Sequence, residues 1–128
     1  MVRVIIPVHG SEVAPRFDLA SEVWIGVQGP DGRFMQERTV VMPQASTENL
    51  CQLIVSEGAH VVVCGAVEQE YFDYLVWKKV TVYDDVIATV DAVKKALEEG
   101  TLKPGAVLLE RILEESEHVL GPVDSPDS

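Results

Sequence analysis

The run RVIIPVHGSEVAPRFDLA at residues 3–20 decides the fold that the rest of the chain builds. Its opening, together with Val2, is an almost continuous apolar run over residues 2–8, which is typical of a central parallel strand buried on both faces. From His9 onward the sequence becomes polar and turn-rich, and it contains Arg16. A central strand that ends in a polar loop is where open α/β sheets place their ligands. We therefore expect residues 9–20 to form a binding loop.

Turn and alternation signals predict an antiparallel hairpin after this loop. Apolar and polar residues alternate over residues 21–28, and the Gly-Pro-Asp-Gly sequence at residues 29–32 is a strong turn signal. Residues 33–42 alternate more loosely and end in an apolar stretch before Pro43. Strand, turn and strand in this order are typical of a hairpin.

Helices and strands alternate over the following residues. Ser46 and Thr47 are N-cap residue types ahead of an apolar stripe, which predicts a helix that ends near Gly58. A second apolar run at residues 59–65 predicts another buried parallel strand. The remaining elements expected here are a helix at residues 68–79 and a short strand at residues 80–83.

A last helix is predicted by an amphipathic stripe with helical spacing. Asp84 or Asp85 is expected to cap its N-terminus, and Gly100 its C-terminus. The stripe consists of Val86, Val90, Val93 and Leu97.

The resulting fold class is α/β, with a five-stranded mixed sheet flanked by helices. Right-handed crossovers place the strand at residues 59–65 beside the first strand, and the hairpin on the first strand's other side. The ends of the two apolar strands, residues 8–10 and residues 64–66, are then expected to meet at one edge of the sheet. Ligands bind at such switch points.

Two segments are expected: an α/β domain at residues 1–103 and an acidic C-terminal extension at residues 104–128. The extension is predicted to form a short helix over residues 106–119 and then to be disordered. Six acidic residues against Arg111 give it −5 of the chain's net charge of −11. Such a helix can fold back onto the domain or dock on a partner.

Composition excludes several classes of function. A net charge of −11 argues against binding nucleic acid or an anionic membrane surface, because both need clustered Lys and Arg. No signal peptide or bilayer-spanning run is visible, and two cysteines are too few for a disulfide framework. We expect a cytoplasmic protein with reduced thiols.

Enzyme chemistry is not indicated. The first strand, residues 2–8, has no carboxylate for metal-assisted phosphoryl transfer, and glycine-rich phosphate motifs are missing. His9 and Cys64 can in principle form a nucleophile and base, but no third group to orient them is evident. We expect a protein that is not an enzyme.

A soft-metal or metal–sulfur site fits the strand ends better. Cys64 and His9 are the candidate metal ligands, since thiolate and imidazole suit such centres. Arg16 is the candidate charge partner for an anionic cluster, and Gly65 completes the cofactor-binding set. Each residue has a simpler explanation: Cys64 as a small core residue, His9 as a solvated loop residue and Arg16 as the ion-pair partner of Asp18.

Other histidines and cysteines are interpreted more simply. Cys51 lies in an apolar helical stripe and is expected to be a core residue. His60 and His118 are expected on the surface.

The segments VAPRFDLA (residues 13–20) and VVVCGAV (residues 61–67), with the strands and helices around them, resemble the dinitrogenase iron–molybdenum cofactor biosynthesis family. This family comprises the small NifX-like domain, which also occurs at the C-terminal end of NifB. The resemblance covers roughly residues 2–103. It implies a ribonuclease-H-like fold without nuclease activity and the binding of iron- or molybdenum-containing sulfur clusters. Many family members have a Gly- or His-rich loop before the first helix, whereas residues 42–47 of this chain have neither.

These observations lead to one expected function and one alternative. The expected function is to bind or carry a metal–sulfur cluster or precursor transiently during metallocofactor assembly, with assembly or acceptor proteins as partners. The alternative is a metal-free protein-interaction or regulatory module on the same fold, which the absent Gly/His loop and the acidic extension favour. A homodimer, the identity of the metal and a link to nitrogen fixation are left open.

Overall fold

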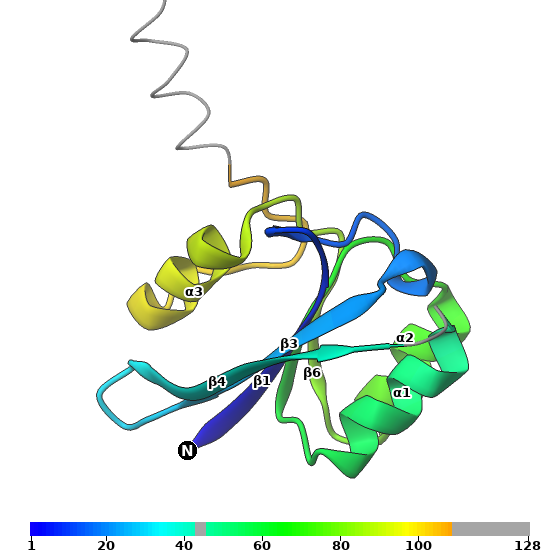
Figure 1. Cartoon of the computed structure of the whole chain (residues 1–128), viewed down its shortest axis with the longest axis horizontal. Coiled ribbons are helices and arrows are strands. Elements are labelled where there is room, and N and C mark those ends of the chain that lie inside the picture. Colours follow the sequence, from blue (N-terminus) through cyan, green and yellow to red (C-terminus); the bar gives the residue numbers. More distant parts are fainter. Residues whose placement is uncertain (43–45, 109–128) are drawn as a thin grey trace, which may run out of the picture.

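The computed structural model describes residues 1–42 and 46–108, which form a mixed sheet with helices on both faces (Figure 1). The sheet runs β4-β3-β1-β5-β6, and a short strand β2 pairs with β1. The strands are β1 (Val2–His9), β2 (Glu12–Val13), β3 (Glu22–Gln28), β4 (Phe34–Val41), β5 (Val61–Val63) and β6 (Thr81–Tyr83). The helices are the 3₁₀ turn η1 (Phe17–Leu19), α1 (Thr47–Ser56), α2 (Gln69–Trp77) and α3 (Val90–Glu99).

The predicted strand neighbours are confirmed. β1 pairs in parallel with β5, with Val4 opposite Val61 and Ile5 opposite Val62. On its other side β1 pairs antiparallel with β3, the first strand of the predicted hairpin. The described sheet has six strands where five were predicted. The additional strand, β2, forms because Gly10 adopts a left-handed conformation (φ 64°) that turns the chain back on β1.

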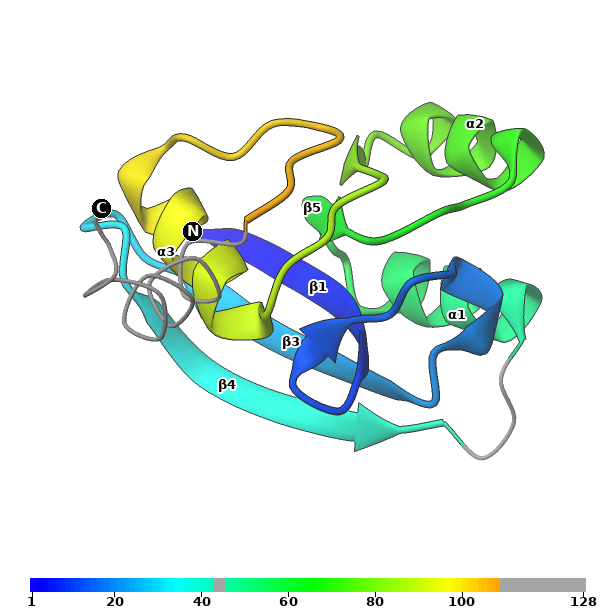
Figure 2. The same cartoon turned by 90° about the horizontal axis from the view of Figure 1, so that it is seen from above.

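The sheet is covered by α1 and α2 on one face and by α3 on the other (Figures 1 and 2). Successive residues of β1 contribute to opposite layers: Ile5 packs with the buried side chains of α1 and α2, while Val4 and Ile6 pack with those of α3. All three are fully buried, which confirms that the first apolar run is a central strand.

The predicted start of the last helix was wrong. α3 begins at Val90, and its N-cap is Thr89, whose hydroxyl accepts a hydrogen bond from the backbone N–H of Ala92 (3.1 Å). Asp85 instead lies in a tight loop with φ 56°, a conformation that Asp tolerates better than most residues. Gly100 is the left-handed C-cap (φ 70°), as predicted.

The start of the C-terminal extension is extended rather than helical. Ile87 N–H donates to the Ala106 carbonyl and Leu108 N–H donates to the Ile87 carbonyl, each at 2.9 Å. These bonds hold residues 106–108 along the loop after β6, so a helix does not begin at Ala106. Residues 109–128, with the rest of the predicted helix, lie outside the described residues, and the domain boundary at residue 103 stays a prediction. In the part of the chain that is described, no helix has the length and hydropathy that a bilayer crossing needs.

Residues 14–17 are inserted between the end of β1 and the residues after β5. Ala14 N–H donates to the Pro7 carbonyl (2.9 Å) on one side. On the other side Ala66 N–H donates to the Pro15 carbonyl (2.9 Å), and Phe17 N–H donates to the Ala66 carbonyl (2.8 Å). A Cβ on Gly65 would overlap the carbonyl oxygens of Ala14 and Pro15, so only glycine fits beneath this crossing.

Gly65→Ala should lower the free energy of unfolding by about 3 kcal/mol, the upper range for overpacking, because backbone carbonyls cannot move aside as a flexible side chain can. Gly58→Ala is the control: Gly58 has a left-handed backbone (φ 68°) but open space around it, so only the backbone strain should cost stability, about 1 kcal/mol. Urea unfolding of both variants measures the difference. Equal losses would contradict the steric role of Gly65.

Candidate functional site

The inserted residues 14–17 bring the two sequence motifs together. Arg16 forms a parallel bridge with Ala66, so the VAPRFDLA and VVVCGAV segments are hydrogen-bonded neighbours at the carboxyl end of β5. The direct meeting of residues 8–10 with residues 64–66 that the sequence predicted is absent, because β2 and residues 14–16 lie between them. Proximity at this sheet edge is therefore confirmed for Arg16 but not for His9.

Cys64 lies in the core beneath this edge. Its side chain is fully buried among residues that pack against α1 and α2. The backbone is fixed on both sides, since Cys64 N–H donates to the Tyr83 carbonyl (2.9 Å) and its carbonyl accepts from Val86 N–H (3.0 Å). Burial, with smaller contributions from the charges of Asp84 and Asp85, raises the pKa of the thiol from 9.0 to about 12. The thiol is therefore protonated at neutral pH.

Cys51 is the second buried thiol. It lies in α1 and belongs to the same core layer as Cys64, which confirms the prediction that it is a core residue. Burial raises its pKa to about 11. Both cysteines are free thiols. Metal ligation needs the thiolate, so neither sulfur is poised to bind a metal in this conformation.

Arg16 lies at the surface and pairs with Asp18. Its Nε donates to Asp18 Oδ1 (3.2 Å) and its Nη2 to Oδ2 (2.8 Å), a two-point contact within the loop. The guanidinium side chain is 62% exposed, so solvent screens this pair and its contribution to stability is at most about 1 kcal/mol. The simpler explanation of Arg16, an ion pair with Asp18, is thus confirmed, and an incoming anion would compete with that carboxylate.

His9 is exposed at the end of β1, opposite Glu12 in the β1–β2 turn. Its imidazole is accessible to solvent, whereas the Cys64 sulfur is enclosed, so the two candidate ligands are not parts of one site as folded. Across residues 1–42 and 46–108, three His, Cys, Asp or Glu side chains do not come together in a way that could hold a metal ion.

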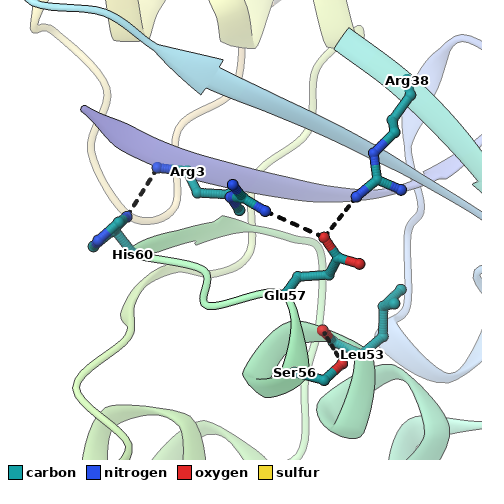
Figure 3. Close-up of polar contacts among 6 residues, drawn as sticks. All are labelled: Arg3, Arg38, Leu53, Ser56, Glu57 and His60. Carbon is teal, nitrogen blue, oxygen red and sulfur yellow. Dashed lines mark hydrogen bonds and ion pairs between the residues drawn. The ribbon is translucent and has the colours of Figure 1, made fainter. Parts of the chain in front are cut away.

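Two polar features escaped the sequence analysis. At the opposite end of the sheet from His9, Glu57 Oε1 accepts from Arg38 Nη2 (2.6 Å) and Arg3 Nη1 (3.4 Å), and His60 Nδ1 accepts from Arg3 N–H (2.9 Å) (Figure 3). His60 is at the surface, as predicted. These four residues come from β1, β4 and the residues between α1 and β5. Because they are far apart in the sequence, no local motif predicts their contacts.

The second feature is a shallow hollow of about 220 Å³ on the α3 side of the sheet. It lies between the β1–β2 turn, strands β3 and β4, and the start of α3. Its lining residues are Val8, Gly10, Ser11, Glu22, Trp24, Thr39, Thr89, Val90 and Asp91. The lining is acidic and hydroxyl-rich and does not include His9, Arg16 or Cys64. No signal in the sequence could have found it, because its lining comes from five separate elements and turns.

Comparisons with known proteins show what this fold resembles. No family model matches the chain, and no curated protein matches it. Among solved structures, PH0822 has a TM-score of 0.71 at 20% identity, covering 80% of this chain and 96% of that one. A "putative dinitrogenase" from Methanocaldococcus jannaschii has a TM-score of 0.66 at 18% identity, covering 79% and 91%. A "putative NifB protein" from Thermotoga, assigned to the DUF35 family, has a TM-score of 0.64 at 25% identity, covering 81% and 93%. The chain therefore shares its α/β fold with proteins named for dinitrogenase and NifB.

Proposed function

We propose that this protein binds or carries a metal–sulfur cluster, or an iron- or molybdenum-containing precursor, as cargo during metallocofactor assembly. The observation that carries the proposal is the pairing of residues 13–20 with residues 61–67. These two segments bear the resemblance to the iron–molybdenum cofactor biosynthesis family, and the structure joins them through Arg16 and Ala66. The names of the structural neighbours support the same role. A NifX-like identity and a ribonuclease-H-like classification belong to this proposal.

Of the proposed contacts, the accessible ones are His9 and Arg16. The His9 imidazole can ligate a metal directly, and the Arg16 guanidinium can pair with an anionic cluster in exchange for Asp18. Cys64 does not fit as a ligand in this conformation, because it is enclosed and protonated. A single exposed imidazole with a nearby cation is suited to transient holding and release rather than to a permanent site.

The alternative is a metal-free interaction or regulatory module, and one observation favours it: the Cys64 thiol is sealed in the core. Under this alternative His9 and Arg16 are surface residues without a cargo. In both cases we propose a protein that is not an enzyme and that acts through assembly or acceptor partners.

Anaerobic loading with iron, molybdate and sulfide tests the cargo proposal. The wild-type protein should retain metal after desalting, and His9→Ala should weaken retention by about tenfold or more, the lower range for damaging a metal site. His60→Asn is the matched control: His60 is also exposed but lies at the other end of the sheet, and Asn keeps an acceptor for Arg3 N–H. Metal content and the visible absorption of the cluster are the readouts.

If the wild-type protein retains no metal under anaerobic conditions, the cargo proposal is wrong, and the metal-free interaction module is the function that remains. Equal losses in His9→Ala and His60→Asn would show that binding does not involve the His9 end of the sheet.

The thiol assignment predicts how stability depends on pH. The unfolded Cys64 thiol ionises near pH 9, while the folded one stays protonated to about pH 12. Above pH 9 the unfolded state binds fewer protons, so the free energy of unfolding should fall by about 1 kcal/mol through Cys64 alone over the first pH unit. This contribution is complete below pH 9 and is lost as pH rises.

Urea unfolding at pH 9 and at about pH 10 measures this slope. Cys64→Ala should remove the contribution of Cys64 to this slope, whereas the control Val63→Ala, an equally buried change that keeps the thiol, should retain the full slope. If Cys64→Ala and wild type lose equal stability over this interval, the thiol is not held protonated by burial.

A further inference from the structure

Helix α2 has an exposed aromatic and cationic surface that the fold does not use. Tyr74 and Trp77 point outward with 39% and 70% of their surfaces exposed, while Leu75 of the same helix is fully buried. The two rings contact each other with centroids 6.3 Å apart. Lys78 Nζ lies over both rings, 4.9 Å from the Trp77 centroid and 5.7 Å from the Tyr74 centroid. We call Tyr74, Trp77 and Lys78 the α2 patch.

This surface combines exposed apolar area with positive charge. A tryptophan that is 70% exposed leaves most of a large apolar side chain in water, a cost that burial against another surface would remove. Lys78 and Lys79 also place two positive charges together in a chain with a net charge of −11. The patch therefore suits an occupant that is both apolar and acidic.

Residues 109–128 of the same chain have this composition. They include the apolar residues Leu109, Ile112, Leu113, Val119 and Leu120. They also carry all six acidic residues of the extension against Arg111, a net charge of −5. The described chain ends at Leu108, which is bound to the loop that follows β6, and α2 directly precedes β6. Residues 109–128 and the α2 patch are thus complementary, because both contain apolar side chains and their charges are opposite.

Reach does not limit this contact. Twenty residues span up to about 66 Å when extended, whereas a domain of about 100 residues has a radius of gyration of about 13 Å. A tether of this kind also raises the local concentration of the segment to the millimolar range, so a weak contact suffices. A second copy is a poorer occupant, because a two-fold contact through α2 would bring the lysines of both copies together.

We propose that the C-terminal segment, residues 109–128, docks on the α2 patch in cis, with its apolar side chains against Trp77 and its carboxylates near Lys78 and Lys79. The patch is then covered in the free protein and becomes available to another apolar, acidic segment when the tail is displaced. This interaction is independent of the cargo proposed above, since neither His9 nor Arg16 takes part.

Quenching of Trp77 fluorescence by acrylamide in the full chain tests the proposal. The other tryptophan, Trp24, is only 7% exposed, and a Trp77→Phe variant defines its share of the signal. Ile112→Ser with Leu113→Ser should raise the quenching of Trp77 severalfold, because the tail loses its apolar contacts. Lys78→Glu should raise it too, and combining it with the tail changes should add little further, as expected for partners in one contact.

Arg33→Glu is the matched charge control. Arg33 is exposed in the β3–β4 turn. This turn lies at the other end of the molecule from α2 in both views (Figures 1 and 2), so the charge reversal should leave Trp77 protected. Equal quenching in the wild type and the Ile112→Ser, Leu113→Ser variant would overturn the proposal. Protection that disappears on dilution would also overturn it, because it would assign the patch to a second copy of the chain.

Discussion

The insertion of residues 14–17 between β1 and the residues after β5 is the constraint on which the geometry of the candidate site depends. β1 and β5 pair directly only at Val4–Val61 and Ile5–Val62. Beyond these pairs, the carbonyl of Pro7 and both backbone groups of Ala66 bond to the inserted residues instead. The backbone polar groups at this edge are thereby satisfied, as buried ones must be. The space this leaves at position 65 admits no side chain.

One consequence of the insertion is that the thiol of the candidate site is buried while its imidazole and guanidinium groups are exposed. The same crossing that covers Cys64 leaves His9 and Arg16 at the surface. The Cys64 thiol, whose pKa burial raises to about 12, is protonated at neutral pH and enclosed by the core, whereas an exposed imidazole is available to any metal that reaches it. Whatever this sheet edge binds must therefore be bound through its surface, unless the inserted residues move.

Much of the fold could be predicted because long apolar runs and strong turn signals are local and redundant. The run at residues 2–8 identified the central strand, and crossover handedness then fixed its neighbours. The start of α3 could not be predicted, since Asp84, Asp85 and Thr89 are all N-cap residue types. The choice among them is made by hydrogen bonds from Asp85 and Val86 to Gly65 and Cys64, which hold the loop out of helical geometry.

The candidate site was less predictable for a related reason. The burial of Cys64 and the Arg16–Asp18 pair were both foreseeable, since each follows from the residue's own surroundings in the sequence. The separation of His9 from Cys64 was not, because it depends on the turn at Gly10, which sends the chain back across the sheet edge. The sequence pattern shows where a strand ends, but it does not show which later segment of the chain lies beside that end in the folded protein.

The two tryptophans differ in how much they contribute to the hydrophobic core. Each has a lysine above its ring: Lys94 lies 5.7 Å from the Trp24 centroid and Lys78 lies 4.9 Å from that of Trp77. Trp24 is buried between the sheet and α3, so packing within the fold accounts for it. Trp77 packs against no core layer, and the inward face of α2 is already provided by Leu75. Folding gains little from an indole in that position, so the Trp77 ring, in contact with that of Tyr74, is left available for an association that the described residues do not complete by themselves.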